Sequence, residues 1–255
     1  MSPALDGQFL RLPMAHRGLH DAAKGRPENS IAAMEAAIVH GYGIEIDVQL
    51  TGDDRAAVFH DYDLDRLTAG RGKVRNRTLA DLATIYLSGS SEGIPGLAEV
   101  LRTVAGQVPL VIEIKDQDGA LGPDVGPLEG AVATAIHGYE GPLAVMSFNP
   151  HSMAAMQALS PEVARGLVTC AFRPGEEPGS QERLAQLAKI ADFERVGASF
   201  ISHDVRDLAN PAIQRLKDAG VPVLCWTVRS LEVERAARKV ADNITFEHYR
   251  PALPA

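Results

Sequence analysis

The sequence predicts an α/β protein in which eight parallel strands, alternating with helices, close into a TIM-type (β/α)8 barrel. Three observations favour this class. Strand-like and helix-like segments alternate along nearly the whole chain, and eight of the strand-like segments fit one repeating cycle. The length of 255 residues is also typical of one such barrel. We therefore expect a single domain over residues 1–255.

The expected strands are short apolar runs bounded by turn residues. In chain order they cover residues 12–15, 43–48, 110–114, 143–147, 164–169, 198–202, 221–228 and 243–246. Segments with helical spacing of apolar residues lie between them, at 30–40, 97–105, 127–137, 150–159, 182–194, 211–219 and 231–240. Asn149 and Asn210 stand directly before Pro150 and Pro211, an order typical of the start of a helix.

One further strand-like segment, residues 56–59, departs from the cycle. Residues 49–55 alone separate it from the preceding strand, which is too short a connection for a crossover helix. The turn-forming residues 52–54 indicate an antiparallel hairpin instead. Such a hairpin would bring His60 back beside the strand over residues 43–48.

Residues 63–96 interrupt the alternation after this hairpin. They are rich in charged residues, Gly and Ser, with a short amphipathic piece near residues 79–87. The stretch is too long for a simple connecting loop. We expect it to form a small cap subdomain over one end of the barrel, inserted after His60.

Composition and charge exclude several functions. The chain has 25 Lys and Arg against 33 Asp and Glu, a net charge of -8, which argues against a nucleic-acid partner. No apolar run approaches the roughly 20 residues that span a bilayer, and residues 1–12 lack the pattern of a secretory signal. Cys170 and Cys225 lie in apolar runs and are expected to be buried. We expect a cytoplasmic protein without stable membrane insertion; the sequence does not set its oligomeric state.

Carboxylates inside two strands are the first candidates for chemistry. Glu45 and Asp47 alternate with apolar residues and so face one side, and Glu113 and Lys115 share a face in the same way. In a parallel barrel, inward carboxylates at strand ends belong to the mouth of the active site. Three such groups repel one another unless a cation neutralises them, and oxygen ligands suit Mg²⁺ or Ca²⁺. The alternative is structural pairing with Arg or Lys on neighbouring strands.

Two histidines are placed where catalytic groups are usually found. His16 and His60 each follow a short apolar run, so each lies at a strand end. Two histidines can divide the roles of general acid and general base near neutral pH. Arg17 and Gly18 follow His16 and add a positive fork beside a position that permits close approach of a ligand. The alternative for each histidine is a hydrogen-bonded structural role, which we assign to the others.

Several short motifs occur together in a fixed order. They are Ala15-His16-Arg17-Gly18, Pro27-Glu28-Asn29-Ser30, Glu45-Ile46-Asp47-Val48-Gln49-Leu50-Thr51, Val58-Phe59-His60-Asp61, Leu64-Asp65-Arg66, Ile94-Pro95-Gly96-Leu97, Glu113-Ile114-Lys115, Ser147-Phe148-Asn149 and Trp226-Thr227-Val228. In this combination and order the chain resembles the glycerophosphodiester phosphodiesterase family, in its small bacterial cytoplasmic type. The resemblance extends from residue 15 to about residue 228.

The resemblance implies a TIM barrel with a cap after the His-Asp pair. It also implies hydrolysis of glycerophosphodiesters, such as glycerophosphocholine or glycerophosphoethanolamine, to sn-glycerol 3-phosphate and an alcohol. The family's one divalent metal ion, Mg²⁺ or Ca²⁺, would fall on Glu45, Asp47 and Glu113. The acid and base would be His16 and His60.

The remaining matches imply binding roles. Arg17 and Lys115 would contact the phosphate, and Trp226 resembles the aromatic wall beside the glycerol or the metal. Glu28 and Asn29 look like supporting residues that orient the mouth of the site.

Two departures from the family pattern and two rival functions are left open. Residues 244–248 replace a Thr-Asp-Pro-like ending, which leaves the register of the last strand open, and Arg229 stands where Asn commonly follows Trp-Thr-Val.

One rival function is a lysophospholipase D that acts on longer lipids with the same site. The other is a catalytically silent barrel that binds a phosphorylated metabolite.

Overall fold

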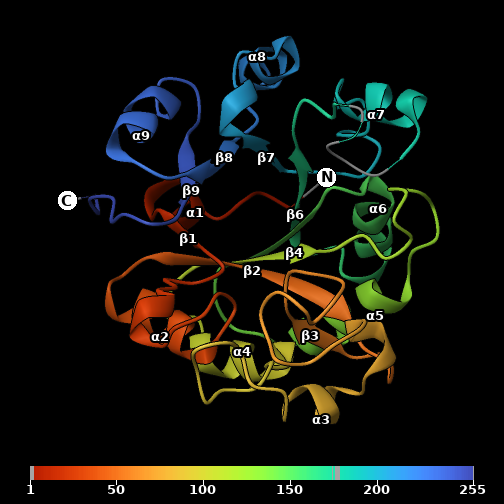
Figure 1. Cartoon of the computed structure of the whole chain (residues 1–255). Coiled ribbons are helices and arrows are strands. Elements are labelled where there is room, and N and C mark those ends of the chain that lie inside the picture. Colours follow the sequence, from red (N-terminus) through yellow and green to blue (C-terminus); the bar gives the residue numbers. More distant parts are fainter. Residues whose placement is uncertain (1–2, 174, 176–178, 255) are drawn as a thin grey trace.

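Eight parallel strands form a closed barrel in the computed structural model, which describes residues 3–173, 175 and 179–254 (Figure 1). Around the barrel the strands are β1 (Met14–His16), β2 (Gly43–Leu50), β4 (Leu110–Ile114), β5 (Leu143–Ser147), β6 (Ala164–Thr169), β7 (Phe200–Asp204), β8 (Val223–Val228) and β9 (Asn243–Phe246). The ring closes because β9 pairs with β1, which also pairs with β2. The predicted barrel is confirmed.

Helices surround the barrel on its outer face (Figure 1). They are α2 (Ile31–Val39), α4 (Leu97–Val104), α5 (Pro127–Ile136), α6 (Pro150–Leu159), α7 (Gln181–Leu187), α8 (Pro211–Asp218) and α9 (Leu231–Ala237), with short 3-10 turns η1 (Ala22–Lys24), η2 (Val74–Asn76) and η3 (Val205–Asp207). Asn149 and Asn210 accept a hydrogen bond from the first turn of α6 and α8, as predicted. In the described part of the chain, no helix has the length and apolar character needed to cross a bilayer.

Several elements have bounds that differ from the prediction, among them β1, which covers 14–16 instead of 12–15, and the three that follow. Helix α7 ends at Leu187 rather than at residue 194, and Ile190 adopts φ 51°, a left-handed conformation that an α-helix cannot continue through. Strand β8 begins at Val223 because the Val221 N–H is already bonded to the end of α8 and Pro222 has no N–H. Strand β7 covers 200–204 instead of 198–202.

A short helix that the sequence analysis missed, α1 (Gln8–Arg11), packs against the amino-terminal end of the barrel. Its Phe9 is fully buried among inward-facing side chains that include Phe200 and Leu224. The side-chain amide of Asn243 donates to the carbonyl of Phe9 at 2.7 Å and fixes the helix on β9. Apolar side chains therefore fill the interior at the amino-terminal end of the barrel. The polar site residues lie at the carboxyl-terminal end of the strands.

Truncating the Phe9 side chain is expected to destabilise the protein by about 3–5 kcal/mol, because it leaves a cavity against the barrel interior. Urea unfolding of Phe9→Ala against the exposed control Gln8→Ala measures the difference. Equal midpoints for the two variants would show that α1 does not support the barrel.

Strand β3 (Ala56–Val58) forms the predicted hairpin with the carboxyl-terminal half of β2. The pairing is antiparallel, with Val58 opposite Val48. The N–H of Phe59 donates to the carbonyl of Asp47 at 3.0 Å. His60 therefore comes back beside Asp47 and the middle of β2, where the hairpin was expected to place it.

Residues 63–96 lie beside this hairpin and contain η2 and the one-turn helix α3 (Leu79–Leu82). Their apolar side chains form a separate cluster with those of β3; it comprises Ala57, Phe59, Leu64, Val74, Leu82, Leu87 and Ile94. The carboxylate of Glu92 accepts hydrogen bonds from Ile31 N and Ala32 N at the start of α2. A fixed carboxylate at a helix start satisfies free N–H groups and joins this segment to the barrel.

Candidate active site

A cavity of about 670 Å³ opens at the carboxyl ends of the barrel strands, within the usual range for small-molecule sites. Seven of the ten predicted site residues line it: His16, Arg17, Glu45, His60, Glu113, Lys115 and Trp226. Asp47, Glu28 and Asn29 do not line the cavity but contact lining residues or one another from behind.

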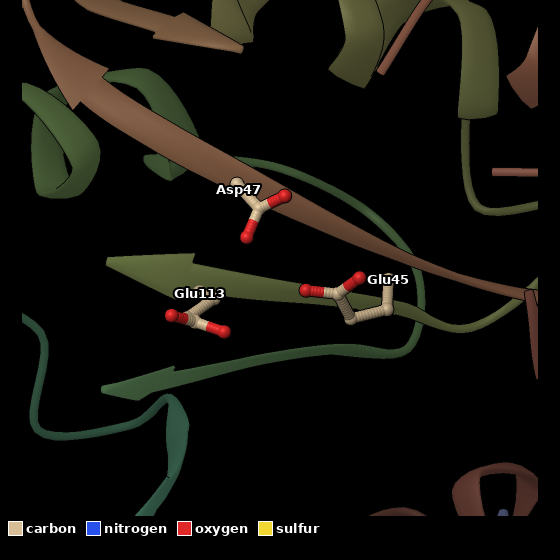
Figure 2. Close-up of side chains that lie close together, drawn as sticks. All are labelled: Glu45, Asp47 and Glu113. Atoms are coloured by element: carbon tan, nitrogen blue, oxygen red, sulfur yellow. The ribbon is translucent and has the colours of Figure 1, made fainter. Parts of the chain in front are cut away.

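The three predicted metal ligands converge. Glu45 and Asp47 lie on β2, and Glu113 lies on β4 directly opposite Asp47. All three side chains are buried, and one carboxylate oxygen from each lies within 4.8 Å of the others (Figure 2). The alternation read from the sequence thus directs these carboxylates toward one point, while their apolar neighbours in both strands pack outward against the helices.

Glu45 is the least compensated carboxylate of the cluster. Burial, followed by the charges of Asp47 and Glu113, raises the pKa of Glu45 well above its ordinary value. Among the described residues, Glu45 Oε1 is buried and has no hydrogen-bond partner. A hard divalent cation prefers such carboxylate oxygens and would satisfy this atom. The residues present therefore fit a metal ion.

Lys115 enters the same cluster. Its Nζ lies 2.5 Å from Glu113 Oε1 and 2.8 Å from Asp47 Oδ1. Burial disfavours the charged ammonium, yet these two carboxylates raise the pKa of Lys115 above its ordinary value. Burial likewise opposes ionisation of Asp47, but Lys115 and other nearby cations hold the pKa of Asp47 low. Lys115 is therefore a charged partner of two metal-ligand candidates.

The loop between β1 and α2 supports the carboxylates from behind. The N–H of Arg17 donates to Glu45 Oε2 at 3.0 Å, and its Nη1 donates to Glu28 Oε1 at 2.6 Å. The side-chain amide of Asn29 donates to Asp47 Oδ2 at 2.9 Å. Arg17 and Asn29 both have positive φ, at 56° and 60°, a conformation that is uncommon outside glycine and here aims both residues at the cluster.

His16 is held by a carboxylate. Its Nδ1 lies 2.8 Å from Glu247 Oε2, while Nε2 lies 3.9 Å from Glu45 Oε2. Although burial opposes ionisation of Glu247, the hydrogen bond from His16 leads the effects that lower the pKa of this carboxyl. An ionised carboxylate is an acceptor, which assigns the proton to His16 Nδ1 and leaves Nε2 toward the carboxylate cluster.

His60 has the same kind of partner. Its Nδ1 is 2.7 Å from Asp61 Oδ1, and its side chain is 31% exposed at the wall of the cavity. Burial opposes ionisation of Asp61, but hydrogen bonds from Arg66 and His60 lower the pKa of Asp61. Both predicted catalytic histidines thus line one cavity with a carboxylate on Nδ1.

Trp226 contributes to an apolar wall of the cavity. Its ring packs edge to face against Phe148, with centroids 5.5 Å apart, and its Nε1 donates to the carbonyl of Ser202. Leu121 and Met146 complete this wall. The wall offers a surface to an apolar part of a ligand.

Comparison with known proteins gives this arrangement a family. The model described as "Glycerophosphoryl diester phosphodiesterase family" matches residues 16–244. The chain belongs to this family. It is 34% identical over 245 residues to the glycerophosphodiester phosphodiesterase of Caldanaerobacter subterraneus subsp. tengcongensis, an alignment that covers 91% of this chain and 92% of the other.

Solved structures in the family share the fold. An Oleispira antarctica phosphodiesterase in complex with the product sn-glycerol-3-phosphate matches with a TM-score of 0.74 and 26% identity, covering 92% of this chain and 93% of the other. The Thermotoga maritima glycerophosphodiester phosphodiesterase matches with a TM-score of 0.67, covering 92% and 94%. At 22% identity, the second match supports the barrel alone.

In this member of the glycerophosphodiester phosphodiesterase family, Glu247 is one functional residue that the sequence analysis missed. It lies in the segment that departs from the Thr-Asp-Pro-like ending, directly after β9, whose bounds are those predicted. The available signal was an acidic residue following the strand that must pair with the strand of His16. Arg229, identified as a change at the rim, pairs with Glu247 through its Nε. The uncertain register appears as an irregularity between β8 and β9 at Cys225 and Val228.

Proposed function

We propose that the protein hydrolyses glycerophosphodiesters, such as glycerophosphocholine or glycerophosphoethanolamine, to sn-glycerol 3-phosphate and an alcohol. The observation that carries this proposal is one cavity that combines a buried carboxylate cluster with two histidines, each bonded to a carboxylate. Phosphodiester cleavage requires both charge neutralisation at the phosphoryl oxygens and proton transfer at the attacking and leaving oxygens. The product bound to the Oleispira antarctica relative supports the same substrate class.

Glu45, Asp47 and Glu113 would hold one divalent cation, Mg²⁺ or Ca²⁺. When bound, such a cation supplies positive charge that stabilises the phosphoryl oxygens as negative charge develops on them. Arg17 and Lys115 line the same cavity and would contact the phosphate. Glu28 and Asn29 would keep Arg17 and Asp47 in place.

His16 and His60 would transfer the protons. Burial lowers the pKa of His16, which keeps its ring neutral near pH 7 and able to accept a proton at Nε2. The carboxylates on Nδ1 fix each ring and stabilise the imidazolium as it forms. One histidine takes the proton of the nucleophile, which is water or the glycerol 2-hydroxyl, and the other gives a proton to the leaving alkoxide.

Release of sn-glycerol 3-phosphate tests the proposal directly. Protein stripped with EDTA is assayed on glycerophosphocholine and glycerophosphoethanolamine, before and after addition of Mg²⁺ or Ca²⁺. We expect release only with metal, and the ion that restores it identifies the cofactor. Absence of release with either substrate and either ion, from protein shown to be folded, would contradict the proposal.

The apolar wall at Trp226 and Phe148 favours one second candidate, a lysophospholipase D activity. An apolar surface beside the phosphate site would accept part of an acyl glycerol. Comparing kcat/KM for lysophosphatidylcholine and glycerophosphocholine separates the two. A higher value for the lipid would replace our proposal with this candidate.

Replacing Glu247 by glutamine is expected to lower kcat by about 10- to 10²-fold, because His16 loses the group that fixes its ring. The acid limb of the pH profile should also move to lower pH. The Glu247 carboxylate stabilises the protonated ring and so raises the pKa of His16; its removal lowers this pKa and keeps the ring neutral at lower pH. Glu194→Gln, at an exposed position, is the control. An unchanged acid limb in the Glu247 variant would contradict the role of Glu247 as the carboxylate that raises the pKa of His16.

A further inference from the structure

One side chain of residues 63–96 reaches into the hydrogen-bond network of the site. The guanidinium of Arg66 donates from Nε to Asp61 Oδ2 at 2.7 Å and from Nη2 to Asp61 Oδ1 at 2.8 Å. It also donates from Nη1 to Glu28 Oε2 at 3.0 Å and from Nη2 to Glu28 Oε1 at 2.9 Å. Both oxygens of both carboxylates are therefore bound by one planar group.

Each of these carboxylates also holds a residue that faces the cavity. Asp61 Oδ1 accepts from His60 Nδ1, and Glu28 Oε1 accepts from Arg17 Nη1 at 2.6 Å. His60 follows β3 and Arg17 follows β1, so they come from segments far apart in the sequence. Arg66 connects the two segments through one carboxylate on each side.

An arginine is suited to this position for a geometric reason. Its planar fork can bind two carboxylates on two oxygens each, whereas a lysine ammonium acts as a single point charge. The positive charge between Asp61 and Glu28 also offsets the repulsion between these two anions. Hydrogen bonds from Arg66 help to keep the pKa of each carboxyl low despite its burial.

We propose that Arg66 is a positioning residue for the phosphodiester reaction. By binding Asp61 and Glu28 together, it fixes the His60 ring and the Arg17 guanidinium relative to each other at the cavity. This role rests on the proposed function, in which His60 transfers a proton and Arg17 contacts the phosphate. Displacement of a catalytic group by about 1 Å can cost about 10²-fold in rate. The side chain is 48% exposed, and exposed ion pairs contribute little to stability, so activity should suffer more than folding.

Three variants test the proposal. Arg66→Ala removes the bridge, Arg66→Lys keeps the charge without the fork, and Arg71→Ala is the matched control. Arg71 belongs to the same segment, is 73% exposed and lies 3.6 Å from Asp65. We expect kcat to fall by about 10- to 10²-fold in both Arg66 variants. The Arg71 variant should keep the wild-type kcat, and all three should keep the wild-type thermal midpoint.

Two readouts separate positioning from a merely structural role. Free guanidinium ion should restore part of the kcat of Arg66→Ala without raising that of the wild type or of Arg71→Ala. The double variant Arg66→Ala with Asp61→Asn should lose less activity than the two single losses combined, because both changes break the same connection to His60. A folded Arg66→Ala protein with the kcat of the control, or fully additive losses in the double variant, would overturn the proposal.

A measurement that needs no turnover keeps this test distinct from that of the proposed function. The imidazole Nδ1–H resonance of His60 reports its hydrogen bond to Asp61 by NMR. We expect this resonance to shift or broaden in Arg66→Ala and to stay unchanged in Arg71→Ala. If the wild type releases no sn-glycerol 3-phosphate, the proposed function has failed; if the resonance is unchanged in Arg66→Ala, the role of Arg66 has failed.

Discussion

Replacing Glu45 by glutamine is expected to abolish metal-dependent activity while leaving the metal-free protein at least as stable as the wild type. The Glu45 carboxylate is buried, and burial together with Asp47 and Glu113 raises its pKa. Glutamine has nearly the same shape and no charge, so it removes the repulsion without creating a cavity. The same substitution removes an anionic ligand from the cluster that would hold the metal.

The loss of activity should be large. Removing a metal that contributes about 4 kcal/mol of transition-state stabilisation corresponds to about 10³-fold in rate. Thermal midpoints measured with and without Mg²⁺ or Ca²⁺ check the binding step separately: the wild type should rise with metal concentration and Glu45→Gln should not. Glu35→Gln, on the exposed face of α2, is the control. A wild-type metal response in Glu45→Gln would exclude Glu45 as a ligand.

The parts of the site that could be predicted depend on local rules. Alternation along a strand directs Glu45 and Asp47 to one side, and a connection too short for a helix returns His60 to the same strand. The neighbouring strands then need only the usual order of a parallel barrel to bring Glu113 opposite Asp47. Each of these relations involves few residues and allows few strand registers. The spacing of the motifs is therefore enough to predict them.

The missed features depend on closure of the barrel. His16 and Glu247 are 231 residues apart, and they meet because β9 pairs with β1 at the point where the ring closes. The acidic residue after β9 indicates that partner only when the closure of the ring is taken into account. The helix α1 is missed for a related reason: four residues are too few to form a stable helix alone, and burial of Phe9 against the barrel supplies what the segment lacks.

Removing either His16 or His60, the two histidines proposed to transfer protons, is expected to lower kcat by at least about 10²-fold, the usual contribution of general acid–base catalysis. In His16→Ala, Glu247 keeps its contact with Arg229, so the fold should persist. In His60→Ala, Asp61 keeps its hydrogen bonds to Arg66. Circular dichroism and the thermal midpoint check folding, and sn-glycerol 3-phosphate release gives kcat. Near-normal turnover in both variants would contradict proton transfer by His16 and His60.

The leaving group then distinguishes the two roles. The p-nitrophenyl ester of sn-glycerol 3-phosphate releases a phenolate that departs without a proton, so general acid catalysis contributes little to its cleavage. The variant that lacks the general acid should therefore recover much of its rate on this ester, while the variant that lacks the general base should stay slow. The buried, neutral ring of His16 and its Nε2 directed toward the carboxylate cluster favour His16 as the base. We accordingly expect recovery in His60→Ala; recovery in His16→Ala instead would reverse the roles, and recovery in neither would show that leaving-group protonation does not limit the reaction.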